Sequence, residues 1–343
     1  MVKFGSLLPI PAAQPSSLIK VALRTENAGF DSVWVADHLL MIPTGIVPEA
    51  FSLLASIATT TQKVDLGTCV SDPHRRHPAV FAQIAATIDQ ISNGRMIIGL
   101  GCGEAMNIEP FGIPWNKPVA RMKEFVEIVR KLWKEENITY NGKFWKMNGA
   151  FLQIKPKREV PIYLGANGPL TRKLAGIMAD GWLPFPQSPE LYKKHLKEIK
   201  SAARKVGREL DNFETCIYIY TAVSKDYNEA LEQLKKIKPI IAFFPKILEE
   251  AGYSVDKRFD KNLYSKILVN EEGMKKFEEF GRQVPDEVVE QFSIVGRVED
   301  CLNKIEEFVK AGVKHFVLIN MGPDPKYVMD IYSKKIIPSF KEL

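Results

Sequence analysis

The chain has 343 residues, 45% of them apolar and 26% charged, a composition typical of a globular protein with a large core. Its net charge of +6 comes from Lys and Arg interleaved with acids, so no basic block is dense enough for a nucleic-acid partner. Four scattered cysteines, with no C-x-x-C pair, argue against a disulfide framework or structural zinc site and favour a reducing cytoplasm. We also expect no signal segment and no membrane span, because no apolar run approaches roughly 20 residues.

Strand-like and helix-like runs alternate along the chain. Eight strands are predicted, at residues 2–8, 30–36, 64–70, 96–100, 160–165, 181–184, 213–223 and 314–320. Helices are predicted at residues 16–28, 49–61, 77–92, 118–134, 169–178, 191–206, 298–311 and 327–337. Such alternation is the signature of a parallel sheet with helical crossovers.

Two stretches interrupt this alternation. Residues 139–157 predict a β-hairpin around Asn141-Gly142. Residues of about 224–285 are too long for one crossover and predict a mostly helical insertion, with a mobile middle near residues 252–263. With eight strands, the sequence favours an α/β fold, a single (β/α)8 TIM-barrel domain over residues 1–343 with these two insertions. The alternative is a doubly wound open sheet, which the strand count and an incomplete dinucleotide-binding pattern disfavour.

In such a barrel the functional face is formed by the carboxyl ends of the strands, and several polar residues stand there. The second strand ends in Asp37 and His38, and the fourth runs into a glycine-rich turn that carries Glu104 and Asn107. A histidine and a glutamate that reach one pocket from different strands suit proton transfer. The alternative for His38 is a buried histidine bonded to Asp37 or to a carbonyl group. The alternative for the glycine-rich turn is a tight strand-to-helix turn in which Glu104 is solvated.

Two further motifs follow strand ends. The turn Gly165-Ala-Asn-Gly-Pro169 opens a helix and could hold an anionic group on backbone N–H donors, or it could be a simple βα turn. The basic cluster at residues 74–77 could meet phosphate or carboxylates, or could be solvated. The sequence contains neither an H-E-x-x-H metal motif nor a G-x-S-x-G serine motif.

Seven segments, in the right order, resemble the bacterial-luciferase-like (β/α)8 barrels, and within them the branch that uses the deazaflavin coenzyme F420. They are spread over most of the chain and lie at residues 28–38, 66–73, 78–83, 92–95, 99–107, 160–169 and 292–296. They include Ala28-Gly-Phe-Asp-Ser-Val-Trp-Val-Ala-Asp-His38 and Gly99-Leu-Gly-Cys-Gly-Glu-Ala-Met-Asn107. The resemblance implies a deazaflavin pocket lined by Asp37, Cys69, Val70, Gly103, Glu104, Asn107, Ala166, Asn167 and Gly168, with a non-proline cis peptide between Cys69 and Val70.

The resemblance also implies catalytic roles. In the alcohol- and sugar-oxidising members, the histidine that matches His38 takes the alcohol proton while hydride leaves for the coenzyme. The glutamate that matches Glu104 protonates or hydrogen-bonds the reduced ring. We therefore expect an F420-dependent oxidoreductase that acts on a small molecule; the alternatives are an FMN-dependent monooxygenase of the same barrel and a non-enzymatic flavoprotein. The resemblance also implies a homodimer that forms through helices near the second and third strands. The apolar helix face at residues 81–91 is a candidate for that interface; the alternative is that it packs against the barrel of its own subunit.

The departures from the family pattern bear on the substrate. Residues 39–43 replace the tryptophan that sugar-phosphate-specific members carry, and Gln291 stands where those members have a basic residue, so glucose 6-phosphate is disfavoured. The Gly-Glu-Ala-Met-Asn run is shared with the alcohol dehydrogenase branch. The branch that reduces methylenetetrahydromethanopterin is matched better at Gly165-Ala-Asn-Gly-Pro169 but usually carries a glutamate in place of Ser6. Both substrate classes, a secondary alcohol or carbonyl and a methylene-pterin, stay open.

Overall fold

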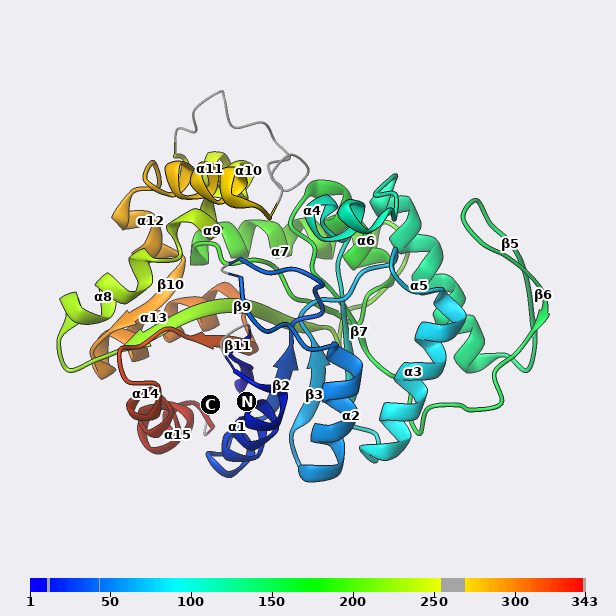
Figure 1. Ribbon diagram of the computed structural model, residues 1–343, viewed down its shortest axis with the longest axis horizontal. Helices are drawn as coiled ribbons and strands as arrows, with labels where there is room; N and C mark the ends of the chain where they lie inside the picture. Colours follow the sequence, from blue (N-terminus) through cyan, green and yellow to red (C-terminus); the bar gives the residue numbers. More distant parts are fainter. Residues whose placement is uncertain (11–12, 43, 254–268, 342–343) are drawn as a thin grey trace.

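We describe a computed structural model of the chain, in which residues 1–10, 13–42, 44–253 and 269–341 are placed. Its centre is a ring of eight parallel strands, with helices outside the ring (Figure 1). These strands are β1 (Lys3–Leu7), β2 (Ser32–Val35), β3 (Asp65–Thr68), β4 (Met96–Leu100), β7 (Ile162–Leu164), β8 (Gly181–Trp182), β9 (Glu214–Val223) and β11 (His315–Asn320). The ring closes because β1 pairs with both β2 and β11, while β9 pairs with both β8 and β11. The predicted (β/α)8 barrel is confirmed.

A ninth parallel strand, β10 (Ser293–Gly296), was not predicted. It pairs with the last four residues of β9, beyond the two residues at the start of β9 that pair with β8. A strand of four residues between two helices carries little periodic signal of its own. Its pairing depends on the unusual length of β9, which extends past its short neighbour.

Helices cover the outside of the barrel. They are α1 (Pro15–Asn27), α2 (Ala50–Thr60), α3 (Pro78–Ile91), α5 (Pro118–Lys134), α6 (Pro169–Met178), α7 (Pro189–Arg204), α13 (Val298–Ala311), α14 (Pro325–Ile331), the π-helical turn η3 (Tyr332–Ile336) and α15 (Ile337–Lys341). Six of them, α1, α3, α5, α6, α7 and α14, begin with proline at the first turn, where its fixed φ suits the helix and its missing N–H costs no helical hydrogen bond. The short α4 (Ala105–Ile108) and the 3₁₀ turn η1 (Glu109–Phe111) follow β4.

Two excursions leave the regular repeat. An antiparallel hairpin, β5 (Ile138–Asn141) with β6 (Lys146–Ala150), projects to one side (Figure 1). After β9 come α8 (Tyr227–Lys235), α9 (Lys238–Ala242), α10 (Pro245–Glu250), α11 (Glu271–Gly281) and α12 (Asp286–Gln291). We call the segment from α8 to α12 the helical insertion. The mobile middle that the sequence predicted falls largely on residues 254–268, which lie outside the described residues.

The interior of the barrel is filled by side chains from the strands themselves. One cluster of buried residues joins Trp34, Ile97, Tyr163, Leu183, Cys216 and Val317. Trp34 occupies space that its neighbours leave free, because a Cβ on Gly67 would lie 2.2 Å from Cε3 of the indole. The indole N–H donates to Ser32 Oγ (2.7 Å), and His315 Nε2 lies 2.8 Å from the same oxygen. Packing of this kind makes the barrel a filled core rather than a pore.

The buried His315 predicts a loss of stability in mild acid. Burial lowers its pKa from 6.5 to about 3, so the unfolded chain takes up a proton before the folded one as the pH falls below 6.5. The free energy of unfolding should therefore decrease from pH 6.5 down toward pH 3, by about 2 kcal/mol at pH 5 from this residue alone. The measurement is denaturant unfolding of wild type and of His315→Asn at pH 7 and pH 5.

Between these two pH values, wild type should lose about 2 kcal/mol more than His315→Asn. His77→Asn is the matched control, because His77 is exposed and asparagine retains its N-cap role on α3. Equal losses in wild type and His315→Asn would contradict the prediction.

Candidate active site

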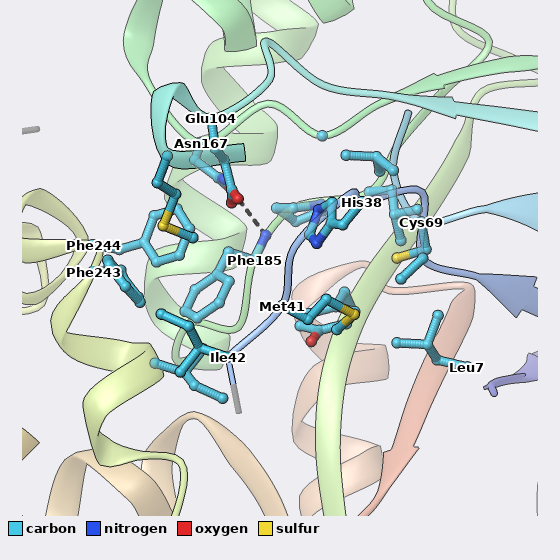
Figure 2. A pocket seen from close by; sticks show the side chains of 18 of the residues that line it. Leu7, His38, Met41, Ile42, Cys69, Glu104, Asn167, Phe185, Phe243 and Phe244 are labelled. Atoms are coloured by element: carbon cyan, nitrogen blue, oxygen red, sulfur yellow. Dashed lines mark hydrogen bonds between the residues drawn. The ribbon is translucent and has the colours of Figure 1, made fainter. Parts of the chain in front are cut away.

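A cavity of about 220 Å³ lies where the strands of the barrel end. This volume is several times the roughly 30 Å³ share of one water molecule, so an organic group fits inside. Strand ends line one side of the cavity, and the helical insertion lines the other (Figure 2). The lining residues are Leu7, Ala36, His38, Leu40, Met41, Ile42, Cys69, Val70, Glu104, Met106, Gly165, Asn167, Leu183, Pro184, Phe185, Tyr218, Tyr220, Ile240, Phe243, Phe244 and Phe277.

His38 and Glu104 meet in this cavity, as Figure 2 shows. His38 stands in the loop after β2, and Glu104 is the residue before α4. The His38 imidazole makes no hydrogen bond to any residue within the described ranges, so the alternative of a histidine bonded to Asp37 or a carbonyl is not what the structure contains. Both ring nitrogens are therefore available to a ligand in the cavity.

Asn107 links the loop of His38 to Glu104. Its side-chain amide donates from Nδ2 to Glu104 Oε2 (2.8 Å) and accepts at Oδ1 from the Leu40 N–H (2.9 Å). Asn107 is buried and does not line the cavity. Because both halves of the amide are used, the carboxylate and the histidine loop are held relative to each other. In the structure, Asn107 thus orients groups at the site from behind the cavity wall.

Cys69 and Val70 form part of the cavity wall, and the peptide bond between them is cis. Burial raises the pKa of the Cys69 thiol to about 12, so the sulfur is a neutral thiol at physiological pH. Two glycines on and after β4 allow the close approach of this segment. A Cβ on Gly99 would lie 2.0 Å from the Thr68 carbonyl oxygen, and one on Gly101 would lie 2.8 Å from Val70 Cγ2.

The turn after β7 contributes Gly165 and Asn167 to the cavity, whereas Ala166 and Gly168 do not line it. Asn167 Oδ1 accepts from the Phe185 N–H (2.8 Å), which connects this turn to the loop after β8. Three N–H groups of the turn have partners in the protein, the first being Gly165 N–H, which donates to the Leu100 carbonyl (2.9 Å). Ala166 N–H donates to the Leu164 carbonyl, and Gly168 N–H donates to Thr171 Oγ1. These bonds favour the βα-turn interpretation of the motif over an anion cradle.

Asp37 does not line the cavity, although the family resemblance implied that it lines the cofactor pocket. Its carboxylate is 2% exposed and accepts from Ser71 Oγ (2.5 Å) and from Arg76 Nη1 (2.7 Å) and Nη2 (3.1 Å). Arg75 Nη2 lies 3.0 Å from the same carboxylate. Gly103 likewise does not line the cavity. Asp37 therefore belongs to a buried ion-pair network beneath the site.

The basic cluster at residues 74–77 supplies this network. Arg75 also pairs with Asp72, and Arg76 pairs with Glu49 at 2.7 Å. Burial favours the neutral acid at Asp72, but the charge of Arg75 and its hydrogen bonds outweigh burial and lower the pKa of this carboxyl. The sequence left open whether this cluster binds phosphate, binds carboxylates or is solvated. In the structure its two arginines pair with carboxylates of the protein itself.

The sequence did not point to two groups of cavity residues. Tyr218 and Tyr220 lie two residues apart on β9, so both side chains point to the same face of the strand. The alternation of tyrosines within the predicted strand at residues 213–223 indicated a shared face, but not that this face meets a cavity. No local sequence signal marks the aromatic wall of Phe243, Phe244 and Phe277. These side chains form a wall only because the helical insertion packs against Met106 and Ile42.

Within the described part of the chain, no group of three or more His, Cys, Asp or Glu side chains is arranged to hold a metal ion. No helix in that same part is long and apolar enough to span a bilayer.

Comparison with known proteins places the chain in a family. A family model described as luciferase-like monooxygenase matches residues 2–315. A 5,10-methylenetetrahydromethanopterin reductase from Archaeoglobus fulgidus is 34% identical over 319 residues, which are 92% of this chain and 93% of the relative. An F420-dependent glucose-6-phosphate dehydrogenase from Microbacterium testaceum is 30% identical, with 99% of this chain and 98% of the relative covered.

A solved structure, an F420-dependent secondary alcohol dehydrogenase in complex with an F420-acetone adduct, has a TM-score of 0.84 to this chain. It is 28% identical, and the match covers 99% of both chains. Since the luciferase-like model extends over most of the sequence and the solved structure shares the fold, this chain belongs to the luciferase-like monooxygenase family.

Proposed function

We propose that this protein is a coenzyme F420-dependent oxidoreductase that transfers a hydride between the deazaflavin and a small organic substrate. The observation that carries the proposal is the shared cavity of His38 and Glu104, which come from different strand ends and face one largely apolar space. The relatives support it, because the reductase, the sugar-phosphate dehydrogenase and the alcohol dehydrogenase are named for chemistry of this kind. The substrate is a secondary alcohol or carbonyl compound, or 5,10-methylenetetrahydromethanopterin as in the reductase branch.

The residues around the cavity fit a flat, largely apolar ring. Gly165 lies beside Val70 in the cavity wall and adds no side chain of its own to that wall. Cys69, Val70, Gly165 and Asn167 would hold the ring, and the Asn167 amide offers polar contacts at its edge. When bound, the deazaflavin supplies the carbon that accepts or donates the hydride.

The protein's own groups handle the proton. A neutral His38 imidazole accepts the proton of the substrate hydroxyl in the oxidative direction and returns it to the carbonyl oxygen in the reductive direction. The Glu104 carboxyl group provides a second proton-transfer or hydrogen-bonding group on the cofactor side. Asn107 keeps that group oriented through its bond to Oε2. The apolar walls limit the access of water to these steps.

The direct test is to mix the purified protein with oxidised coenzyme F420 and a panel of secondary alcohols, and to follow the visible absorption of the coenzyme. Loss of absorption with an alcohol supports the proposal. A second arm offers reduced coenzyme with ketones and with methylenetetrahydromethanopterin, which separates the two substrate classes. A yellow protein that contains FMN and consumes oxygen would instead support the monooxygenase alternative.

Glucose 6-phosphate should be a poor substrate. Among the described residues that line the cavity none is lysine or arginine, so a phosphate would lose its hydration without gaining a countercharge. We expect its kcat/KM to be at least about 100-fold below that of an uncharged secondary alcohol, because an unpaired buried charge costs more than the ~2.7 kcal/mol that this factor represents. Steady-state kinetics on both substrates measures the ratio, and comparable values would contradict the prediction.

We propose in addition that the protein is a cytoplasmic homodimer. The apolar residues at 81–91 do not by themselves supply the interface, because Phe81, Ala82, Ala85 and Ile88 are buried within the subunit, with Phe81 against Phe51 and Phe125. Barrel packing accounts for these four residues, whereas Ile91 at the end of the same helix is 46% exposed. Analytical ultracentrifugation of the purified chain tests the oligomeric state, and a monomer at micromolar concentration would contradict it.

A further inference from the structure

Two tyrosines in the cavity have no part in the mechanism above. Tyr218 and Tyr220 lie on β9 and both line the cavity that contains His38 and Glu104. Their rings meet edge to face, with centroids 5.5 Å apart. Their hydroxyl oxygens are 2.9 Å apart, so one phenol donates a hydrogen bond to the other.

This pair leaves one donor unused. Each phenol carries one O–H group, and the contact between the two oxygens uses only one of the two hydrogens. Neither hydroxyl bonds to any other residue among those that the structure describes. One O–H group and several lone pairs of these two cavity-lining side chains are therefore left without a partner among the described residues.

The surroundings make that unused donor selective. The neighbouring walls are apolar: Phe185 lies 6.1 Å from Tyr218 between ring centroids and stacks on Phe244. Burial raises the pKa of both phenols, so they stay protonated donors at neutral pH. A buried O–H group without an acceptor is unfavourable, and a ligand oxygen at this point removes that penalty. A ligand without such an oxygen is then disfavoured relative to one that carries it.

We infer that Tyr218 and Tyr220 form a hydrogen-bond donor site for an oxygen atom of an uncharged substrate with an apolar body, and that this pair determines specificity. The inference rests on the proposed function, because it assumes that the substrate binds in this cavity next to the coenzyme. It narrows the substrate to neutral ketones and alcohols, because the lining offers an O–H donor and aromatic walls but, among its described members, no cation.

The first test requires no coenzyme. Cyclohexanone and methylenecyclohexane have nearly the same shape, but only the ketone carries an acceptor oxygen. Dissociation constants for both are measured by ligand-observed NMR titration on wild type and on the double variant Tyr218→Phe/Tyr220→Phe. Relative to wild type, the double variant should shift the ratio of the two constants by about tenfold in favour of methylenecyclohexane. An unchanged ratio, or a wild type that binds neither compound, overturns the inference.

The second test uses the enzyme with its coenzyme. The double variant should lose about 10- to 100-fold in kcat/KM for cyclohexanol, with the dissociation constant for coenzyme F420 within about twofold of wild type. Tyr227→Phe is the matched control, because Tyr227 donates to Glu290 Oε2 (2.8 Å) on the outer helices, away from the cavity, and should leave kcat/KM unchanged. A double variant within threefold of wild type in kcat/KM overturns the inference.

The two tests separate the inference from the proposed function. If wild type neither binds coenzyme F420 nor turns over alcohols, the proposed function fails, and the ligand pair without coenzyme still decides the role of the tyrosines. Thermal melting of the double variant shows whether it is folded. If the double phenylalanine change unfolds the protein, the titration is repeated on the two single variants. At least one of them should shift the ligand ratio in favour of methylenecyclohexane, because it loses the hydroxyl that faces the ligand, and an unchanged ratio in both overturns the inference.

Discussion

Replacement of His38 by asparagine should lower kcat for alcohol oxidation by about 10²- to 10⁴-fold, the usual contribution of a positioned general base. Asparagine has a similar size and polarity but cannot take up a proton. The His38 imidazole faces the cavity and has no hydrogen bond to another residue in the described ranges, so its replacement should disturb little else. Steady-state kinetics at saturating coenzyme and substrate measures the loss.

The dissociation constant for oxidised coenzyme F420 should meanwhile stay within about threefold, since the base acts on the substrate side. Fluorescence titration of the coenzyme measures it. His77→Asn provides the matched control, because it makes the same chemical change at an exposed helix start and should keep full turnover. Lost coenzyme binding with unchanged turnover at saturation would count against the base assignment.

Replacement of Asp37 by asparagine should destabilise the fold by about 3–5 kcal/mol, because it leaves the buried guanidinium groups of Arg75 and Arg76 without their shared carboxylate. The Asp37 side chain is 2% exposed, so water cannot take the place of the lost charge. Denaturant unfolding at neutral pH gives the free energy of unfolding directly.

Glu271→Gln is the control for this change. It removes the same kind of charge from an exposed ion pair with Lys275 on α11, and the unfolding transition should not move measurably. A variant Asp37→Asn that unfolds like wild type but no longer binds coenzyme F420 would contradict the structural role. That result would return Asp37 to the cofactor pocket, where the family resemblance had placed it.

Asp37 and His38 illustrate how far strand ends can be interpreted from sequence alone. Both follow the same strand, and the rule that polar residues gather at the carboxyl ends of strands applies to both. Adjacent side chains point in different directions, however, and the turn after β2 sends only His38 into the cavity. Asp37 is held by Arg75 and Arg76 of the loop after β3, and no local sequence pattern predicts that pairing.

The helical insertion shows the same limit on a larger scale. Its helical character was predictable from its length and patterning. Its aromatic residues became a cavity wall only because α9 and α11 pack together, with Phe243 and Phe277 against Met106 of α4. A hydrophobic helix face is equally consistent with core packing and with a binding wall, and which of these applies depends on the partner surface.

The barrel, its strand order and the candidate pair His38 and Glu104 were thus determined by the sequence itself. Strand and helix periodicity is local, and the carboxyl ends of parallel strands necessarily meet at one rim. The tertiary structure alone decided that β10 extends the sheet, that Asp37 serves an ion-pair network, and that Tyr218 and Tyr220 share the cavity with the aromatic wall. Those features depend on contacts between segments far apart in the chain, and the packing geometry that brings them together leaves no local pattern.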